Sequence, residues 1–166
     1  MDHLWAPWRR DFVTGEKPAG CIFCRFPSET AAGDDRRNLV LGRTLHSFAV
    51  LNLYPYNNGH LMVVPRRHLG DFAQLSEPEL VDLHRLLQVA VRVVQDNYRP
   101  EGANLGMNLG ADAGAGIVGH LHWHVVPRWR GDTNFMPVLG NTKVMVEHLE
   151  QTWQALRPRF DQALAS

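Results

Sequence analysis

The chain has 166 residues, of which 45% are hydrophobic, and its 17 basic residues are balanced by 17 acidic ones. This size and apolar content predict one globular domain over residues 1–166, and the balanced charge excludes a broad nucleic-acid-binding or membrane-binding surface. No apolar run approaches the roughly 20 residues of a membrane span, and the first residues, MDHLWAPWRRDF, are aromatic and charged where a signal peptide is apolar, so we expect a cytoplasmic protein.

Two cysteines, Cys21 and Cys24 in the stretch CIFC, are the only ones in the chain. In a reducing compartment such a pair is more often half of a metal site or a redox pair than a structural disulfide. Of these two alternatives we favour the metal site.

The next segment predicts short strands. Residues 31–38, AAGDDRRN, are polar and rich in turn formers, which indicates a surface loop. Residues 39–53, LVLGRTLHSFAVLNL, are typical of two short strands. YPYNNGH, residues 54–60, supplies a turn before the continuous apolar strand LMVVP, residues 61–65.

The clearest helix covers residues 76–98. Ser76 is followed three residues later by Glu79, which is the signature of a capping box. Apolar residues then recur at helical spacing, namely Leu80, Leu83, Leu87, Val91 and Val94.

The second half of the chain continues with strands. Residues 102–116, GANLGMNLGADAGAG, predict a strand and a glycine-rich bend, and residues 120–129, HLHWHVVPRW, predict the next strand. A second amphipathic helix is predicted over about 141–157, stopped by Pro158. Strands, a helix, more strands and a second helix predict an α+β fold built on an antiparallel sheet.

Three histidines, His120, His122 and His124, alternate along the last predicted strand. Because side chains alternate between the faces of a strand, the three imidazoles would form a row spaced roughly 7 Å apart, with apolar residues on the other face. A lone histidine is usually a surface or core residue, but three in register favour chemistry. Two functional interpretations stand: a metal site, or a nucleophilic histidine flanked by helpers.

At this point the sequence resembles the histidine triad (HIT) family. HLHWHVV is similar to the signature of alternating histidines and apolar residues, and further similarity lies in CIFC, LNLYPYNNGHLMVVPRRH and MNLGADAGAG. The resemblance covers about residues 21–130 and is strongest to the branch that contains bacterial diadenosine tetraphosphate (Ap4A) phosphorylases. It implies a HIT-like fold, a homodimer and a nucleotidyl hydrolase or transferase.

The resemblance implies three catalytic histidines. His122 would attack the α-phosphorus and become a nucleotidyl-histidine, His124 would donate to a non-bridging phosphate oxygen, and His60 would orient the triad. The chemistry is reasonable because imidazole, with an ordinary pKa near 6.5, offers a lone pair at cytoplasmic pH.

The same resemblance suggests where the nucleotide binds. Asn52 falls at a ribose-contacting position and Asn108 at one that contacts phosphate or ribose, although either asparagine alone is more typical of a turn. Gly114, Ala115 and Gly116 lie in a stretch of small residues whose backbone N–H groups could approach phosphate. Gly116 departs from the family, where Gln or Ser supplies a side chain, and this leaves hydrolysis and phosphorolysis both open.

In zinc-containing family members the ligands match Cys21, Cys24, His68 and His120. Four protein ligands would make the zinc structural. The competing view is a catalytic zinc on His120, His122 and His124, which would leave CIFC unexplained.

These observations predict a HIT-family enzyme acting on adenine dinucleotide polyphosphates or related phosphoanhydrides and phosphoramidates. The alternative is a zinc-stabilised nucleotide-binding regulatory protein whose turnover is incidental. The preferred substrate, the base and the acceptor are not determined by the sequence.

Overall fold

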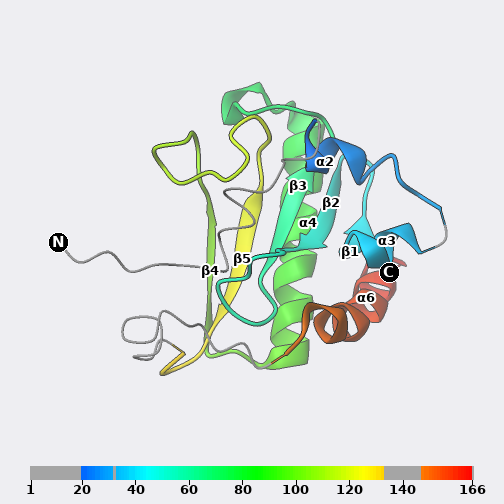
Figure 1. Cartoon of the computed structure of the whole chain (residues 1–166), viewed down its shortest axis with the longest axis vertical. Coiled ribbons are helices and arrows are strands. Elements are labelled where there is room, and N and C mark those ends of the chain that lie inside the picture. Colours follow the sequence, from blue (N-terminus) through cyan, green and yellow to red (C-terminus); the bar gives the residue numbers. More distant parts are fainter. Residues whose placement is uncertain (1–19, 32, 133–146, 166) are drawn as a thin grey trace.

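A computed structural model of the chain describes residues 20–31, 33–132 and 147–165. Its centre is an antiparallel sheet with helices, which confirms the predicted α+β class (Figure 1). The strands are β1 (Val40–Arg43), β2 (Ser47–Leu51), β3 (Leu61–Pro65), β4 (Gly102–Met107) and β5 (Trp123–Arg128). Their spatial order is β1-β2-β3-β5-β4, so β5 lies between β3 and the edge strand β4.

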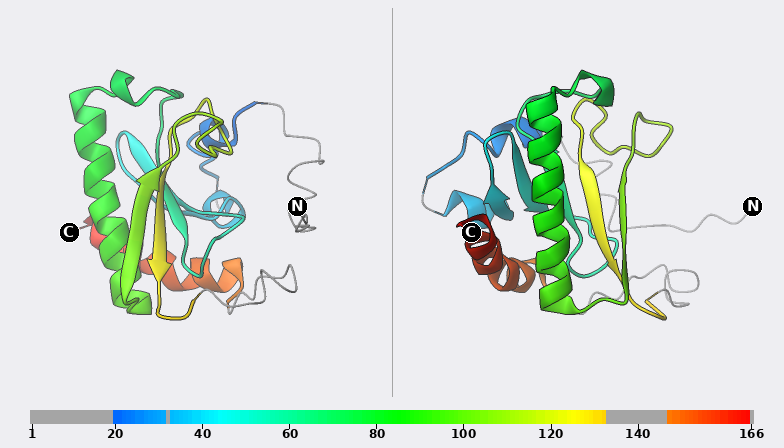
Figure 2. Two further views of the ribbon diagram at one scale, coloured as in Figure 1. Left: turned by 90° about the vertical axis from the view of Figure 1, so that its left-hand side faces the viewer. Right: turned by 180° about the vertical axis from the view of Figure 1, so that it is seen from behind.

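The two faces of the sheet are covered differently. Helices α4 (Glu77–Tyr98) and α6 (Leu149–Ala165) lie against one face, where they form the larger core (Figure 2). The short helix α2 (Ile22–Arg25) covers part of the other face, where Phe23 packs against Phe48 of β2. Met62 belongs to this second cluster and is the register partner of His124, so His124 faces the α2 side of the sheet.

Helix α4 begins with the predicted capping box. The Glu79 carboxylate accepts from the Ser76 backbone N–H at 2.9 Å, and the helix ends after Tyr98 with Arg99 in the left-handed conformation. Leu83, Leu87 and Val94 of the predicted apolar stripe are buried against the sheet, whereas Leu80 and Val91 are half-buried. A 3-10 turn, η2 (Phe72–Gln74), precedes this helix.

The predicted end of the second helix at Pro158 is wrong. Helix α6 continues through Pro158 to Ala165, and it begins at Leu149, after non-helical residues 147–148. Proline inside a helix costs roughly 3 kcal/mol, because one hydrogen bond is lost and the ring crowds the preceding turn. Phe160 offsets that cost, since its side chain is fully buried against β1, where Gly42 leaves room for it. Residues 141–146 of the predicted helix lie outside the described residues.

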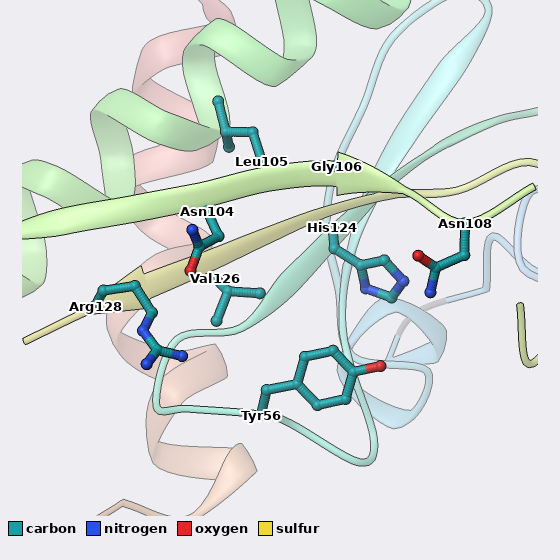
Figure 3. Close-up of a pocket in the computed structure, with 8 residues that line it drawn as sticks. All are labelled: Tyr56, Asn104, Leu105, Gly106, Asn108, His124, Val126 and Arg128. Atoms are coloured by element: carbon teal, nitrogen blue, oxygen red, sulfur yellow. The ribbon is translucent and has the colours of Figure 1, made fainter. Parts of the chain in front are cut away.

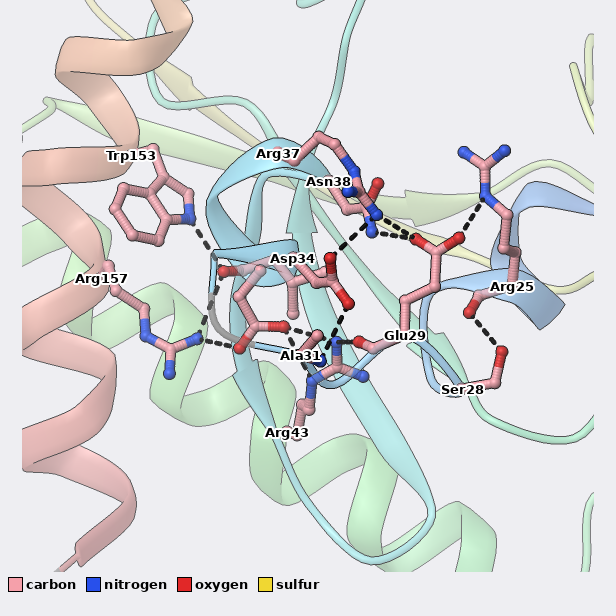
Figure 4. A network of polar contacts seen from close by, with 12 residues as sticks. Arg25, Ser28, Glu29, Ala31, Asp34, Arg37, Asn38, Arg43, Trp153 and Arg157 are labelled. Carbon is pink, nitrogen blue, oxygen red and sulfur yellow. Dashed lines mark hydrogen bonds and ion pairs between the residues drawn. The ribbon is translucent and has the colours of Figure 1, made fainter.

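The predicted surface loop at 31–38 contains a single helical turn, α3 (Asp34–Arg37). Asp34 is buried, and the Asp35 carboxylate pairs with Arg43 of β1 and with Arg157 of α6 at 2.8 Å (Figure 4). The polar residues of this segment therefore fasten it to the sheet and to α6, and they do not simply face solvent.

The prediction of a strand over residues 120–129 is too long at both ends. Strand β5 begins at Trp123 and ends at Arg128, so His120 and His122 precede it and only His124 lies on it. The rings of His122 and His124 are consequently closer than the predicted row, with centroids 5.1 Å apart. No helix within the described ranges is long and apolar enough to span a bilayer.

Candidate functional site

Two thiols and two imidazoles meet at one end of the sheet. Cys21 precedes α2 and Cys24 lies on it, and their Sγ atoms approach His120 Nδ1 at 3.4 Å and His68 Nδ1 at 3.1 Å respectively. The four ligand atoms all lie within 4.8 Å of one another. The structure therefore brings together the four residues that the sequence assigned to a metal.

The ring of His120 is turned so that its donor atom faces the thiols. Its Nε2 lies 2.8 Å from the carbonyl oxygen of Pro65, which can only accept, so the proton is on Nε2 and the lone pair is on Nδ1. Burial, followed by the hydrogen bond and the charge of Cys21, raises the pKa of Cys24. A divalent cation would reverse this effect, because it stabilises thiolates. Two thiolates and two imidazoles suit zinc.

His122 has the opposite tautomer to His120. Its Nδ1 donates to the carbonyl oxygen of His120 at 2.8 Å, so its second nitrogen, Nε2, carries the lone pair. The side chain is only 4% exposed, and burial lowers its pKa, which keeps the ring neutral. His122 therefore presents an unprotonated nitrogen that can act as a nucleophile.

A chain of hydrogen bonds sets the proton of His124. The backbone N–H of Tyr56 donates to His60 Nδ1 at 2.9 Å, so neutral His60 carries its proton on Nε2. That Nε2 lies 2.9 Å from His124 Nδ1, which must then accept, and the proton of His124 is on its Nε2. Burial, with a smaller contribution from His122, lowers the pKa of His124 to about 4. His124 is thus a neutral hydrogen-bond donor.

The three histidines of the motif are not arranged as a metal site in this structure. His122 Nδ1 and His124 Nδ1 are both engaged in hydrogen bonds, with a carbonyl oxygen and with His60. Among the described residues, the one group of side chains that could hold a metal is the cysteine–histidine cluster. The competing view of a catalytic zinc on the three histidines is therefore not favoured.

The nucleotide-binding candidates lie around these histidines. Asn52 Oδ1 accepts from the Tyr54 backbone N–H at 3.0 Å, and Asn52 Nδ2 lies 3.4 Å from both ring nitrogens of His60. Asn108 Nδ2 is 3.5 Å from the carbonyl oxygen of Gly114. Both asparagine side chains therefore make contacts typical of turns, which is what an isolated asparagine usually does. Asn52 lies beside the hydrogen-bonded histidines, and Asn108 lies beside the glycine-rich loop.

The glycine-rich loop uses part of its own backbone. Gly114 has φ +88°, and the N–H groups of Gly114 and Ala115 donate to the carbonyl oxygens of Ala111 and Gly110. These two N–H groups are committed to the turn in this structure. Gly116 is exposed in the bend that follows. The phosphate-binding role of the three residues stays a prediction.

Next to His124 the α2 face of the sheet has a hollow of about 220 Å³ (Figure 3). Its lining residues are Tyr56, Asn104, Leu105, Gly106, Asn108, His124, Val126 and Arg128. Sequence reasoning missed Tyr56 and Asn104 as site residues. The signal for Asn104 was its place on β4 four residues before Asn108, which follows that strand. Only the register that pairs Gly106 with His124 brings β4 beside the histidines.

Comparisons with known proteins agree with this geometry. A family model described as HIT domain matches residues 35–131. The AP-4-A phosphorylase of Mycobacterium tuberculosis is 40% identical over 166 residues, covering 94% of this chain and 83% of that protein. The asymmetrical bis(5'-nucleosyl)-tetraphosphatase of Schizosaccharomyces pombe is 34% identical over 93 residues, covering 56% and 50%. A zinc-bound histidine triad family protein from Mycobacterium smegmatis has the same fold, with a TM-score of 0.67 at 22% identity over 88% of this chain and 96% of that one.

Proposed function

The chain belongs to the HIT domain family, and from this premise we propose that it is a nucleotidyl hydrolase or transferase acting on adenine dinucleotide polyphosphates such as Ap4A. The observation that carries the proposal is the pair of fixed tautomers: His122 offers a lone pair on Nε2, and His124 offers a proton on Nε2. Nucleotidyl transfer requires a nucleophile that attacks phosphorus and a donor that binds a phosphate oxygen, and these two adjacent rings can supply them.

In the first step, His122 Nε2 attacks the α-phosphorus. The new N–P bond forms as the bond to the bridging oxygen breaks, and with Ap4A the leaving group departs as ATP with that oxygen and its electron pair. The ring of His122 becomes cationic and keeps its proton on Nδ1, where the carbonyl oxygen of His120 accepts it. This fixed acceptor stabilises the charge that develops on the ring.

His124 serves the same step as a donor. Its proton on Nε2 would bind a non-bridging oxygen of the phosphorus group, where negative charge must be held during transfer. His60 positions it through the bond between His60 Nε2 and His124 Nδ1. Asn52, Asn108 and the segment Gly114, Ala115 and Gly116 are proposed to contact the ribose and phosphates.

In the second step, an acceptor attacks the α-phosphorus and returns the electron pair to His122 Nε2. Water would release AMP and lose one proton to the solvent, and inorganic phosphate would release ADP. The relative that is 40% identical over nearly the whole chain is a phosphorylase, and the tetraphosphatase matches only part of it, which favours phosphate as the acceptor.

Product analysis with Ap4A, with and without inorganic phosphate, tests this function. We expect ADP and ATP when phosphate is present. AMP and ATP under both conditions would identify a hydrolase. Absence of any mononucleotide would contradict the proposed enzyme and favour the alternative of a nucleotide-binding regulatory protein.

We also propose that Cys21, Cys24, His68 and His120 hold a zinc ion, because their donor atoms suit that metal. A zinc ion with these four protein ligands stabilises the fold and has no open position for water. Metal analysis of protein purified without chelator should find about one zinc per chain. Cys21→Ser should lower both the zinc content and the melting temperature, and a chelator should then have little further effect. A Cys21→Ser protein with full zinc occupancy would remove CIFC from the ligand set.

We propose that the protein is a homodimer and that it is located in the cytoplasm. Both cysteines are free of disulfide in the structure, which suits a reducing compartment. Edge strand β4 is the surface that we propose for the dimer, since the first four of its six residues are exposed.

A further inference from the structure

The hollow beside His124 follows strand β5 away from the catalytic histidines. His124, Val126 and Arg128 are alternate residues of β5, so they share the α2 face of the sheet, and Asn104 and Gly106 of β4 lie beside them in register (Figure 3). Four residues along a strand span roughly 13 Å. The hollow therefore extends along β5 from His124 to Arg128.

The lining of the hollow is suited to an anion. Arg128 contributes a positive charge, Asn104 and Asn108 contribute amides, and none of the eight lining residues is a carboxylate. Gly106 keeps the floor open, because a Cβ atom built there would meet nothing within 4 Å. Tyr56, which is 50% exposed, forms the wall opposite β4 and β5.

Arg128 is held in place by residues behind it. Its Nη2 donates to Asp132 Oδ1 at 2.9 Å, and Asp132 Oδ2 accepts from Asn57 Nδ2 at 2.8 Å and from the Trp129 backbone N–H at 3.1 Å. The Asp132 side chain is 10% exposed and that of Arg128 is 41% exposed. Because the contact with Asp132 already orders the Arg128 guanidinium, the side chain loses little conformational entropy when its exposed part binds phosphate. The planar guanidinium also matches the geometry of two phosphate oxygens.

The position of the hollow identifies the part of the substrate that it would receive. Asn52, the candidate for the ribose of the transferred nucleotide, follows β2, which is separated from β5 by β3. The hollow lies over β5 and β4, with Tyr56 of the loop that follows Asn52 as its opposite wall. The transferred nucleotide and the leaving group must extend from the α-phosphorus in different directions.

We propose that this hollow is the leaving-group subsite and that Arg128 binds the distal phosphates of a polyphosphate leaving group. This inference rests on the proposed nucleotidyl transfer by His122. It makes Arg128 a determinant of specificity, which favours substrates whose leaving group carries several phosphates over those with a small, uncharged one.

Two substrates with the same transferred nucleotide test the proposal. Ap4A releases ATP, whereas adenosine 5'-phosphoramidate releases ammonia and has nothing to place near Arg128. Arg128→Gln should lower kcat/KM for Ap4A by about 10- to 100-fold, as expected for a lost charged hydrogen bond. The same variant should keep the wild-type kcat/KM for the phosphoramidate. Arg130→Gln, which removes an exposed arginine outside the hollow, is the matched control and should leave both values unchanged.

A second variant keeps the test independent of the Asp132 contacts. Asn104→Leu changes an exposed residue of the hollow and should also lower kcat/KM for Ap4A selectively. Equal losses on both substrates with Arg128→Gln and with Asn104→Leu would overturn the proposal, since they would indicate a disturbed catalytic site. Unchanged kinetics on Ap4A would overturn it as well. A wild-type protein that turns over the phosphoramidate but not Ap4A would refute the subsite and Ap4A as a substrate, while nucleotidyl transfer by His122 would stand. One that turns over neither would refute the nucleotidyl transfer as well.

Discussion

At the scale of single residues, the histidines of the motif differ in what binds the second nitrogen of each ring. The carbonyl oxygen of Pro65 turns the lone pair of His120 toward the cysteines. The carbonyl oxygen of His120 accepts the Nδ1 proton of His122, which leaves the lone pair of that ring on Nε2. The hydrogen bond from His60 Nε2 to His124 Nδ1 keeps the proton of His124 on its Nε2. These contacts suit three identical side chains at alternate positions to the three roles proposed for them: metal ligand, nucleophile and hydrogen-bond donor.

Substitution of His122 and His124, the histidines proposed as nucleophile and donor, should separate their roles. His122→Ala should abolish the covalent step and lower turnover by several orders of magnitude, because it removes the nucleophile. His124→Ala should still form the intermediate but more slowly, by about 10²- to 10³-fold, as for the loss of an oxyanion donor. Both variants should be incubated with α-labelled substrate and quenched in alkali, where a phosphoramidate bond survives better than in acid.

Retention of label on the protein is the measurement. Label bound covalently to His122→Ala would show that another residue is the nucleophile, whatever the effect on turnover. His124→Ala that accumulates no label at long times would show that His124 does more than stabilise charge. Melting temperatures close to that of the wild type are the control for folding.

The sequence could predict which residues belong to the candidate site. It could not predict which ring nitrogen of each histidine carries the proton. Alternation of histidines and apolar residues pointed to His122 and His124, and the CIFC pair pointed to Cys21 and Cys24. His68 and His120, the other two proposed ligands, came from the family resemblance. The partners that fix the protons are backbone atoms of Pro65, His120 and Tyr56. Pro65 is distant from His120 in the sequence, and Tyr56 acts on His124 only through His60, which is 64 residues away from it. The residue types in a sequence do not reveal which backbone atoms will contact a side chain. These contacts can therefore be identified only in the folded structure.

At the scale of elements, the sequence predicted those elements whose pattern is complete within their own residues. Helix α4 has its own capping box and apolar stripe, and β3 is a continuous apolar run. The errors at residues 31–38 and at Pro158 arise where distant contacts decide: Asp35 binds Arg157, and Phe160 is buried against β1. The single domain predicted over 1–166 includes ranges outside the described residues and stays a prediction.

The start of helix α4 also supports a prediction about pH. Glu79 binds Arg67 through both carboxylate oxygens, at 2.7 and 2.8 Å, and this guanidinium, together with the Ser76 bonds, lowers the pKa of Glu79 to about 2. A carboxyl whose pKa is lowered on folding stabilises the protein above its ordinary pKa of 4.5, and this contribution is lost as the pH falls toward about 2. Glu79→Gln should therefore lower the free energy of unfolding at pH 7.

The difference between wild type and variant should then narrow as the pH falls from 4.5 to 2. Denaturant unfolding of both proteins at several pH values measures it. Glu77→Gln removes a carboxylate from an exposed position of the same helical turn and is the control, for which we expect a smaller difference. A Glu79→Gln difference that stays constant over this range would contradict the assigned ion pair, because the effect would then not depend on ionisation.

At the scale of the whole molecule, the sheet ends in an edge strand that the described residues leave uncovered. Strand β4 pairs only with β5, and Leu105 on it is 47% exposed. Beside it lies a second hollow between β4 and α4, lined by Leu105 with Leu87 and Val91. Exposed apolar residues beside an open strand edge are typical of a surface that pairs with another strand.

A second copy of the chain can cover this edge by pairing β4 with β4 about a two-fold axis, because a strand that pairs with itself in this way is antiparallel. Leu105→Lys should then shift the protein from dimer to monomer, since it places a charge on each side of the axis. Light scattering coupled to gel filtration measures the mass. Leu45→Lys is the matched control, because Leu45 is 75% exposed in the turn between β1 and β2, away from the β4 edge, and it should leave the dimer intact. A wild-type monomer, or a dimer that persists in Leu105→Lys but dissociates in Leu45→Lys, would exclude β4 as the interface.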